Sequence, residues 1–78
     1  MLTNDLKNGT RIRLANGWLA TLKDNLKGNT RLAEVEGYVT ETGSVYSHDI
    51  VAYLSNGEWH SVEHTPAQLK LKHQIDST

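Results

Sequence analysis

The sequence contains no cysteine, which excludes disulfides, thiolate zinc sites and thiol nucleophiles together. It has no apolar run approaching the roughly 18 residues that identify a membrane-spanning helix. Residues 1–5 do not show the basic and then apolar pattern of a secretion signal. We therefore expect a cytoplasmic protein with no membrane contact.

Lysine and arginine are missing from a 26-residue stretch in the middle of the chain, residues 39–64. Residues 39–64 carry four acidic residues and no Lys or Arg, whereas residues 1–38 carry six basic residues against four acidic ones. This distribution argues against a non-specific nucleic-acid binder, because such a domain is normally strongly basic throughout. A polarised surface also suits subunits that dock with opposite charges facing each other.

The chain has 78 residues, enough for a single domain over residues 1–78. A domain of this size buries only about 60% of its unfolded surface, so its core is thin. Oligomerisation is a common additional source of stability for such small domains. We therefore expect a homo-oligomer.

Alternating polar and apolar residues, separated by turn signals, predict five strands. Such a pattern is typical of a small, strongly bent antiparallel sheet. The fold class expected is mainly β, a small SH3-like barrel of about five strands with a short C-terminal helix; an OB-like barrel is the alternative. The predicted strands cover residues 10–14, 18–24, 30–36, 50–54 and 58–62.

The hairpin registers follow from requiring that paired residues share a face of the sheet. In the first hairpin, Ile12 then opposes Ala20. This leaves a three-residue loop, residues 15–17, with Gly17 in the left-handed conformation. In the second hairpin, Leu22 opposes Ala33 by the same test.

The second register also brings Asp24 opposite Arg31 on the inward side. One interpretation is a structural ion pair that closes the hairpin. The other is an arginine held at the rim by its carboxylate, ready to meet an anion. The turn over residues 28–31 offers backbone amides, an amide side chain, a hydroxyl and a guanidinium, which bind phosphate or carboxylate well. The alternative for this turn is a hairpin that uses Gly and Asn only for positive φ.

The tail predicts a helix over residues 66–75. Thr65 is a capping residue, Pro66 suits the first helical position, and Gln68 completes a capping box. An apolar stripe at helical spacing, residues 67, 71 and 75, should dock on the barrel. Residues 1–8 are expected to be a loose arm or a short first turn.

The segment Gly43–Ile50 is predicted to be a rigid loop at the barrel rim, displaying a phenol, hydroxyls, an imidazole and a carboxylate. Trp18 and Trp59 are assigned to the core, because a thin core needs large apolar groups. Arg11 and Arg13 are placed on the outward face. The candidate ligand-binding residues are Asn29, Arg31, Ser44, Tyr46, His48 and Asp49.

Catalytic and metal-binding functions find little support in the sequence. His48 and Asp49 could form a general base with its orienting acid, but no nucleophile motif, glycine-rich phosphate loop or carboxylate pair accompanies them. The histidines show no recognised ligand spacing. We expect no enzyme activity, no metal and no cofactor.

The runs Asn8–Trp18, Gly28–Arg31, Glu36–Tyr38 and Gly43–Ile50 resemble a group of short bacteriophage and prophage proteins. The similarity covers residues 4–68. It implies a phage setting, hence the host cell cytoplasm. The opening strands are also similar in pattern to KOW-type barrels of transcription and translation proteins, although the low basic charge departs from them.

Three functional hypotheses follow. The first is a non-enzymatic binding protein that sequesters a small anionic ligand, such as a nucleotide signal of host defence. Arg31 would meet phosphate and Tyr46 would stack on the ligand. The second is a protein–protein inhibitor that binds a host enzyme or defence complex through the acidic segment 39–64. The third is a nucleic-acid-binding KOW-like module.

Overall fold

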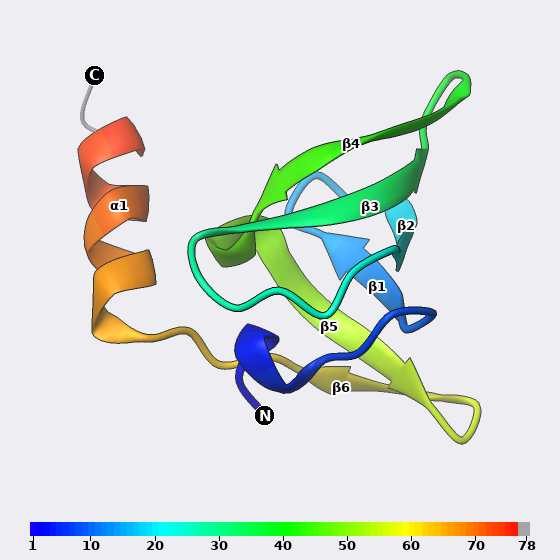
Figure 1. The fold of residues 1–78 in the computed structure, drawn as a ribbon, viewed down its shortest axis with the longest axis horizontal. Coiled ribbons are helices and arrows are strands. Elements are labelled where there is room, and N and C mark those ends of the chain that lie inside the picture. The colour runs from blue at the N-terminus through cyan, green and yellow to red at the C-terminus, as the bar shows by residue number, and fades with distance from the viewer. Residues whose placement is uncertain (77–78) are drawn as a thin grey trace.

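The computed structural model describes residues 1–76 and shows a curved antiparallel sheet with a helix at its C-terminal end (Figure 1). Six strands follow the order β4-β3-β2-β1-β5-β6. A 3₁₀ helix precedes β1, and another joins β4 to β5. The elements are η1 (Thr3–Asp5), β1 (Arg11–Leu14), β2 (Leu19–Leu22), β3 (Thr30–Glu36), β4 (Thr40–Tyr46), η2 (Ser47–Asp49), β5 (Ile50–Ser55), β6 (Glu58–Ser61) and α1 (Pro66–Asp76).

The prediction of a mainly β, antiparallel fold with a short C-terminal helix is confirmed. The strands number six rather than about five, and the sheet does not close, so β4 and β6 are its two edges. The additional strand is β4, which pairs along the whole of β3. The loop predicted over Gly43–Ile50 is therefore wrong for its first half. Its Val and Tyr residues favour extended backbone, and only Ser47–Asp49 leave the sheet.

The predicted registers are confirmed. Ile12 pairs with Ala20 in the first hairpin, and Leu22 pairs with Ala33 in the second. Gly17 has φ of +89°, so the first turn uses glycine for its left-handed conformation as expected. These pairings place Ile12, Ala20, Leu22 and Ala33 together on the buried, concave face of the sheet.

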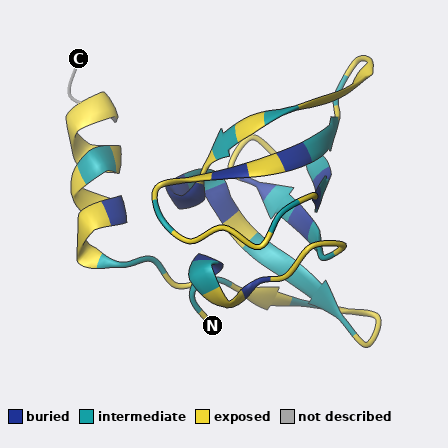
Figure 2. Cartoon of the chain, in the orientation of Figure 1, coloured by how far each residue is buried: buried dark blue, intermediate teal, exposed yellow. Residues whose placement is uncertain are grey.

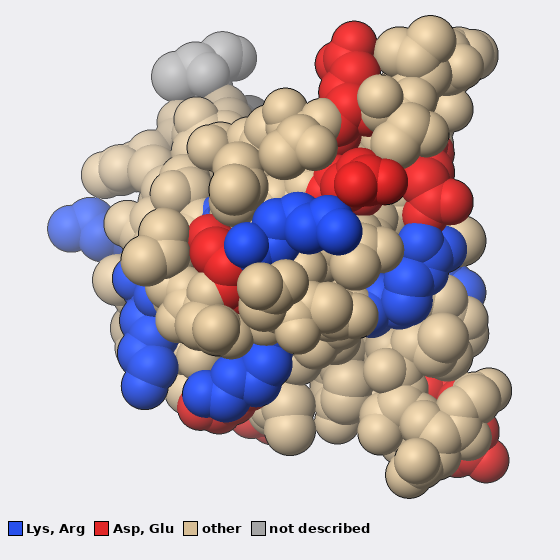
Figure 3. Space-filling model, turned by 45° about the vertical axis from the view of Figure 1, so that its right-hand side comes forward, with Lys and Arg blue, Asp and Glu red and all other residues tan. Residues whose placement is uncertain are grey.

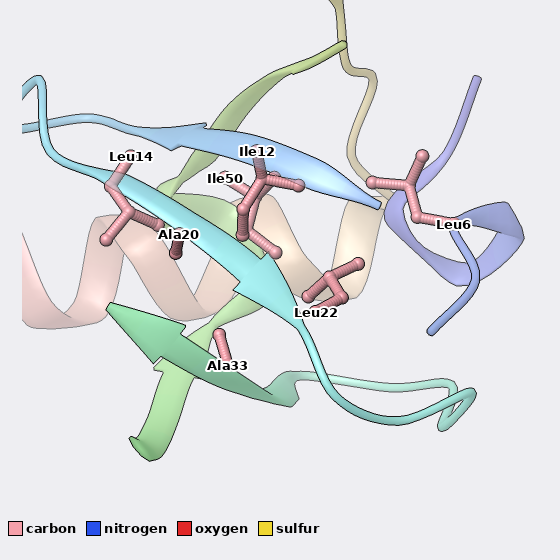
Figure 4. Close-up of a cluster of buried hydrophobic side chains, with 7 residues drawn as sticks. All are labelled: Leu6, Ile12, Leu14, Ala20, Leu22, Ala33 and Ile50. Atoms are coloured by element: carbon pink, nitrogen blue, oxygen red, sulfur yellow. The ribbon is translucent and has the colours of Figure 1, made fainter. Parts of the chain in front are cut away.

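The core is small and apolar. It is formed by one residue of the N-terminal segment together with the concave face of four strands (Figure 4). Val35, Val45, Tyr53 and Val62 pack around it while remaining partly exposed. The seven buried core residues are Leu6, Ile12, Leu14, Ala20, Leu22, Ala33 and Ile50.

The N-terminal segment is not a loose arm. It forms η1, and the Thr3 and Leu6 side chains are buried. Leu2 forms a parallel bridge with Glu63, beside β6. The short-turn alternative is therefore correct, because this segment covers one end of the sheet.

Helix α1 begins with the predicted capping box. The backbone N–H of Gln68 donates to Thr65 Oγ1 at 3.2 Å, and the N–H of Thr65 donates to Gln68 Oε1 at 3.0 Å. The predicted docking through the apolar stripe is observed only in part: Leu71 is half-buried, but Ala67 is exposed and Ile75 is 39% exposed. The buried residue of the helix is Gln68, whose amide donates to Thr3 Oγ1 and to Gly28 O. Polar contacts at its first turn thus anchor the helix, and most of its surface stays exposed (Figure 2).

The tryptophans lie outside the buried core, contrary to the prediction. Trp18 is 41% exposed, lies over Gly37 and meets the ring of Tyr38 edge-on at 5.8 Å. Trp59 is half-buried, with the guanidinium of Arg13 lying 4.4 Å above its ring. The Trp18 indole lies instead in the space that the missing side chain of Gly37 leaves open.

Candidate functional site

A pocket of about 300 Å³ lies between the end of β4 and the turn that joins β1 to β2. The concave-face residues Leu14 and Val45 contribute its apolar wall. Hydroxyl, amide and carboxylate groups contribute its polar part. The lining residues are Leu14, Ala15, Asn16, Ser44, Val45, Tyr46 and Asp49.

Backbone hydrogen bonds hold the two walls of this pocket together. The N–H of Ala15 donates to the carbonyl of Asp49 at 2.8 Å, which ties the β1–β2 turn to η2. Within the turn, the N–H of Gly17 donates to Leu14 O at 2.9 Å, and Asn16 Oδ1 accepts from the N–H of Trp18 at 3.0 Å. The pocket is therefore preformed by main-chain geometry.

Tyr46 and His48 form a stacked pair at one side of the pocket. Their ring centroids are 5.0 Å apart and the planes differ by 11°. Tyr46 is 43% exposed, whereas His48 is buried and its Nδ1 has no hydrogen-bond partner among the described residues. His48 Nε2 lies 3.6 Å from Asp49 Oδ1. The imidazole thus supports the phenol ring from behind, and Tyr46 presents its surface to solvent.

Arg31 does not reach this pocket or the surface. The residue is 1% exposed, and its guanidinium donates to Asp24 Oδ1, Asp24 O, Thr3 O and Leu6 O. These bonds occupy Nε and both terminal nitrogens. The contacts therefore bear out the structural interpretation of the Asp24–Arg31 pair, and a side chain so deeply buried is not accessible to an anion.

Asp24 is held ionised by the same contacts. Burial acts to raise its pKa, but the backbone N–H of Leu32 and the guanidinium of Arg31 outweigh that effect and hold the pKa of Asp24 below its usual range. The N–H of Leu32 donates to Asp24 Oδ2 at 2.8 Å. The ion pair accordingly closes the second hairpin.

The turn at Gly28 and Asn29 is also occupied by internal contacts. The N–H of Gly28 donates to Asn4 Oδ1, and its carbonyl accepts from Ser47 Oγ and from the amide of Gln68. The carbonyl of Asn29 accepts from the N–H of Ser47 at 2.8 Å. This turn therefore joins η1, η2 and α1, and the N–H of Gly28 is already bonded within the fold.

The six sequence-predicted residues divide into two groups. Ser44, Tyr46 and Asp49 line the pocket together, and His48 supports it through Tyr46. Arg31 belongs to the buried polar network instead, whereas Asn29 is exposed and joins that network only through its backbone carbonyl. Sequence reasoning missed Ala15 and Asn16, which it assigned only to a turn. The one sequence signal for these residues was the Asn-Gly pair, which indicates a turn. No local sequence pattern predicts that this turn lies opposite Asp49.

A second hollow, of about 220 Å³, shares its β4 residues with the first. Thr30 pairs with Tyr46 in the sheet, so the side chains of these two residues lie on the same face. That face is the outer one, because the neighbouring Arg31 points inward and is buried. The second hollow is lined by Thr30, Ser44, Val45 and Tyr46.

Asp49 is the one charged residue lining either hollow, and its side chain is 46% exposed. The arrangement therefore favours a ligand that carries positive charge or hydrogen-bond donors. On the outer face of the sheet, by contrast, Arg11 pairs with Glu36, and Lys23 Nζ lies 3.7 Å from a Glu34 carboxylate oxygen. Figure 3 shows acidic and basic side chains next to each other on one face of the molecule.

Within residues 1–76, no three His, Asp or Glu side chains are placed to hold a metal ion together. The helices in that range are also too short or too polar to cross a membrane. Comparison with protein-family models, with curated proteins and with solved structures gives no match.

Proposed function

We propose that this chain is a non-catalytic protein-binding module that recognises a basic segment of a partner protein at the pocket beside β4. The observation that carries the proposal is the Asp49 carboxylate, the one charge in a preformed pocket with apolar walls. The surrounding sequence supports the proposal, because residues 39–64 contain no Lys or Arg. A basic partner would therefore meet no local positive charge from this segment.

An arginine or lysine side chain suits each part of the pocket. Its aliphatic stem can pack against Leu14 and Val45, as long basic side chains do on apolar surfaces. Its charged head can pair with Asp49, and the exposed ring of Tyr46 offers a cation–π contact. Arginine suits the site better than lysine, because a planar guanidinium can pair with a carboxylate and stack on a ring at the same time.

The same geometry disfavours a small anionic ligand. The donors of Arg31 are directed at protein acceptors, and the exposed carboxylate of Asp49 would repel phosphate. Nucleic acid is disfavoured for a related reason, since Arg11 and Lys23 are paired with glutamates. The resemblance to phage proteins makes a host protein the first class of partner to search.

The proposal is tested by fluorescence anisotropy with short labelled peptides that carry one central arginine, against matched peptides with citrulline. We expect measurable binding of the arginine set only. Asp49→Asn should weaken it about tenfold or more, equivalent to roughly 1.4 kcal/mol. Glu58→Gln, a charge-neutralising control in β6 and outside the pocket, should change affinity less than twofold.

Calorimetric titration with cyclic dinucleotides tests the alternative, a small anionic ligand. We expect no heat from these anions. Binding of a dinucleotide combined with no binding of any arginine peptide would overturn the proposal in favour of the anionic-ligand hypothesis. Equal binding of the arginine and citrulline peptides would overturn the role given to Asp49.

A further inference from the structure

We propose that the basic partner segment binds as an additional antiparallel strand along the free edge of β4. This inference rests on the proposed function and specifies how the partner is held. Strand addition supplies affinity through main-chain hydrogen bonds and specificity through pockets for alternate side chains. The geometry of β4 provides both components.

The free hydrogen-bonding groups of β4 can be identified from the ladder. In an antiparallel pair, successive residues alternate between bonding the neighbouring strand and pointing away from it. The N–H of Ser47 donates to Asn29 O, so the alternation that continues into β4 directs the groups of Glu41, Gly43 and Val45 to β3. The outward-pointing N–H and C=O groups therefore belong to Thr40, Thr42, Ser44 and Tyr46.

These outward groups form an unprotected edge. β4 is seven residues long and contains no lysine and no proline, the residues with which proteins usually block edge strands. The other edge is different. β6 has four residues, and beyond its end the N–H of Glu63 donates to Met1 O while Leu2 bridges to Glu63. The N-terminal segment thus covers part of that edge, whereas nothing among residues 1–76 pairs with β4 on its outer side.

The two hollows lie where an added strand would place its side chains. Both are lined by Ser44, Val45 and Tyr46. The larger one includes Leu14 of the concave face, and the smaller one includes Thr30 of the outer face. Successive side chains of an extended strand point to opposite faces. A strand beside residues 44–46 could therefore place one side chain in each hollow, with its arginine directed to Asp49.

The charge of β4 and its neighbours indicates that a basic segment, rather than a second copy of this chain, binds this edge. Pairing of β4 with β4 of another copy would bring together two segments that each carry Glu41 and Asp49 and contain no Lys or Arg between positions 39 and 64. Like charges across paired strands are destabilising. A segment with arginine or lysine and β-branched residues has the complementary charge and the strand propensity.

Proline at position 42 tests the edge directly. Thr42 points its N–H outward and lines neither hollow, so Thr42→Pro removes one donor without breaking a bond to β3. We expect Thr42→Pro to weaken binding of the arginine peptides tenfold or more. Thr42→Ala, which keeps the N–H, and Ser61→Pro, on the opposite edge, should bind within twofold of the native chain.

Binding of N-methylated peptides to the native chain gives a second test. It does not depend on whether the proline variant folds. Methylation of alternate peptide amides should abolish binding, while methylation of the intervening amides should have little effect. If Asp49→Asn abolishes binding but Thr42→Pro and every methylated peptide bind normally, strand addition is overturned and the proposed function stands. If no arginine peptide binds the native chain, the proposed function fails as well. A dimer in sedimentation that Thr42→Pro dissociates, with no peptide binding, would identify a second copy as the occupant and overturn both.

Discussion

The guanidinium of Arg31 lies buried against the carboxylate of Asp24, with Nε donating to Oδ1 over 2.7 Å. The same guanidinium donates to the carbonyls of Thr3 and Leu6. It therefore ties the second hairpin to the N-terminal segment. This position makes the pair a structural element of the domain, and it leaves the pocket beside β4 to Asp49.

Replacing Arg31 by methionine should destabilise the fold by about 3–5 kcal/mol, because the largely buried Asp24 carboxylate loses its ion-pair partner and the carbonyls of Thr3 and Leu6 lose their donor. Urea denaturation followed by circular dichroism would measure the change in the free energy of unfolding. Arg13→Met is the matched control. Arg13 is half-buried over Trp59, and its loss should cost about 1 kcal/mol or less. Equal stability of Arg31→Met and the native chain would contradict the structural role.

Acid should destabilise the chain partly through Asp24. The folded-state pKa of Asp24 lies below its unfolded value, so its contribution is fully present above the unfolded pKa of about 3.9 and is lost as the pH falls through the folded pKa. The free energy of unfolding should therefore decrease with falling pH below about pH 5. In Asp24→Asn this decrease should be smaller, although the variant is less stable at neutral pH. Urea denaturation between pH 2 and pH 7 compares the two, and parallel profiles would rule out the assignment.

Gln68 should matter more than Thr65 for holding α1. Thr65→Ala removes an N-cap hydrogen bond and should cost about 1 kcal/mol. Gln68→Ala removes the reciprocal bond to the Thr65 N–H and also the buried contacts with Thr3 and Gly28, so it should cost about 1–3 kcal/mol more. Hydrogen exchange at the helix amides measures both effects. A larger loss of protection in Thr65→Ala would show that the cap, rather than the buried amide, anchors the helix.

Gly37 should not tolerate a methyl group without movement of Trp18. A Cβ at this position would lie 2.5 Å from the indole Cζ3, whereas a Cβ at Gly43 would meet no atom within 4 Å. Because the indole is partly exposed and can move away, Gly37→Ala should cost only about 1 kcal/mol. Tryptophan fluorescence should shift to the red as the ring leaves Gly37 and Tyr38. Gly43→Ala is the control, and the same spectrum in both variants would contradict the contact.

The polar segment Gly43–Ile50 shows where sequence patterns were informative and where they failed. Three of the polar residues that it contributed as site candidates, Ser44, Tyr46 and Asp49, line one pocket together, and ligand binding there stays a prediction. The pattern failed to predict β4 because alternation is weak when an edge strand exposes most of its residues. The strand forms because β3 offers a full set of partners, which is a tertiary condition.

Sequence by itself determined the registers of the first two hairpins, the left-handed turn at Gly17, the capping box of α1 and the juxtaposition of Asp24 with Arg31. Each of these depends on residues that are near in sequence or paired across one hairpin, so periodicity and turn chemistry suffice. Only the tertiary structure decided that Arg31 is buried, because the carbonyls of Thr3 and Leu6 come from a distant segment. It also decided that Asn16 and Asp49 share a pocket, since sheet curvature brings together groups that no local pattern relates.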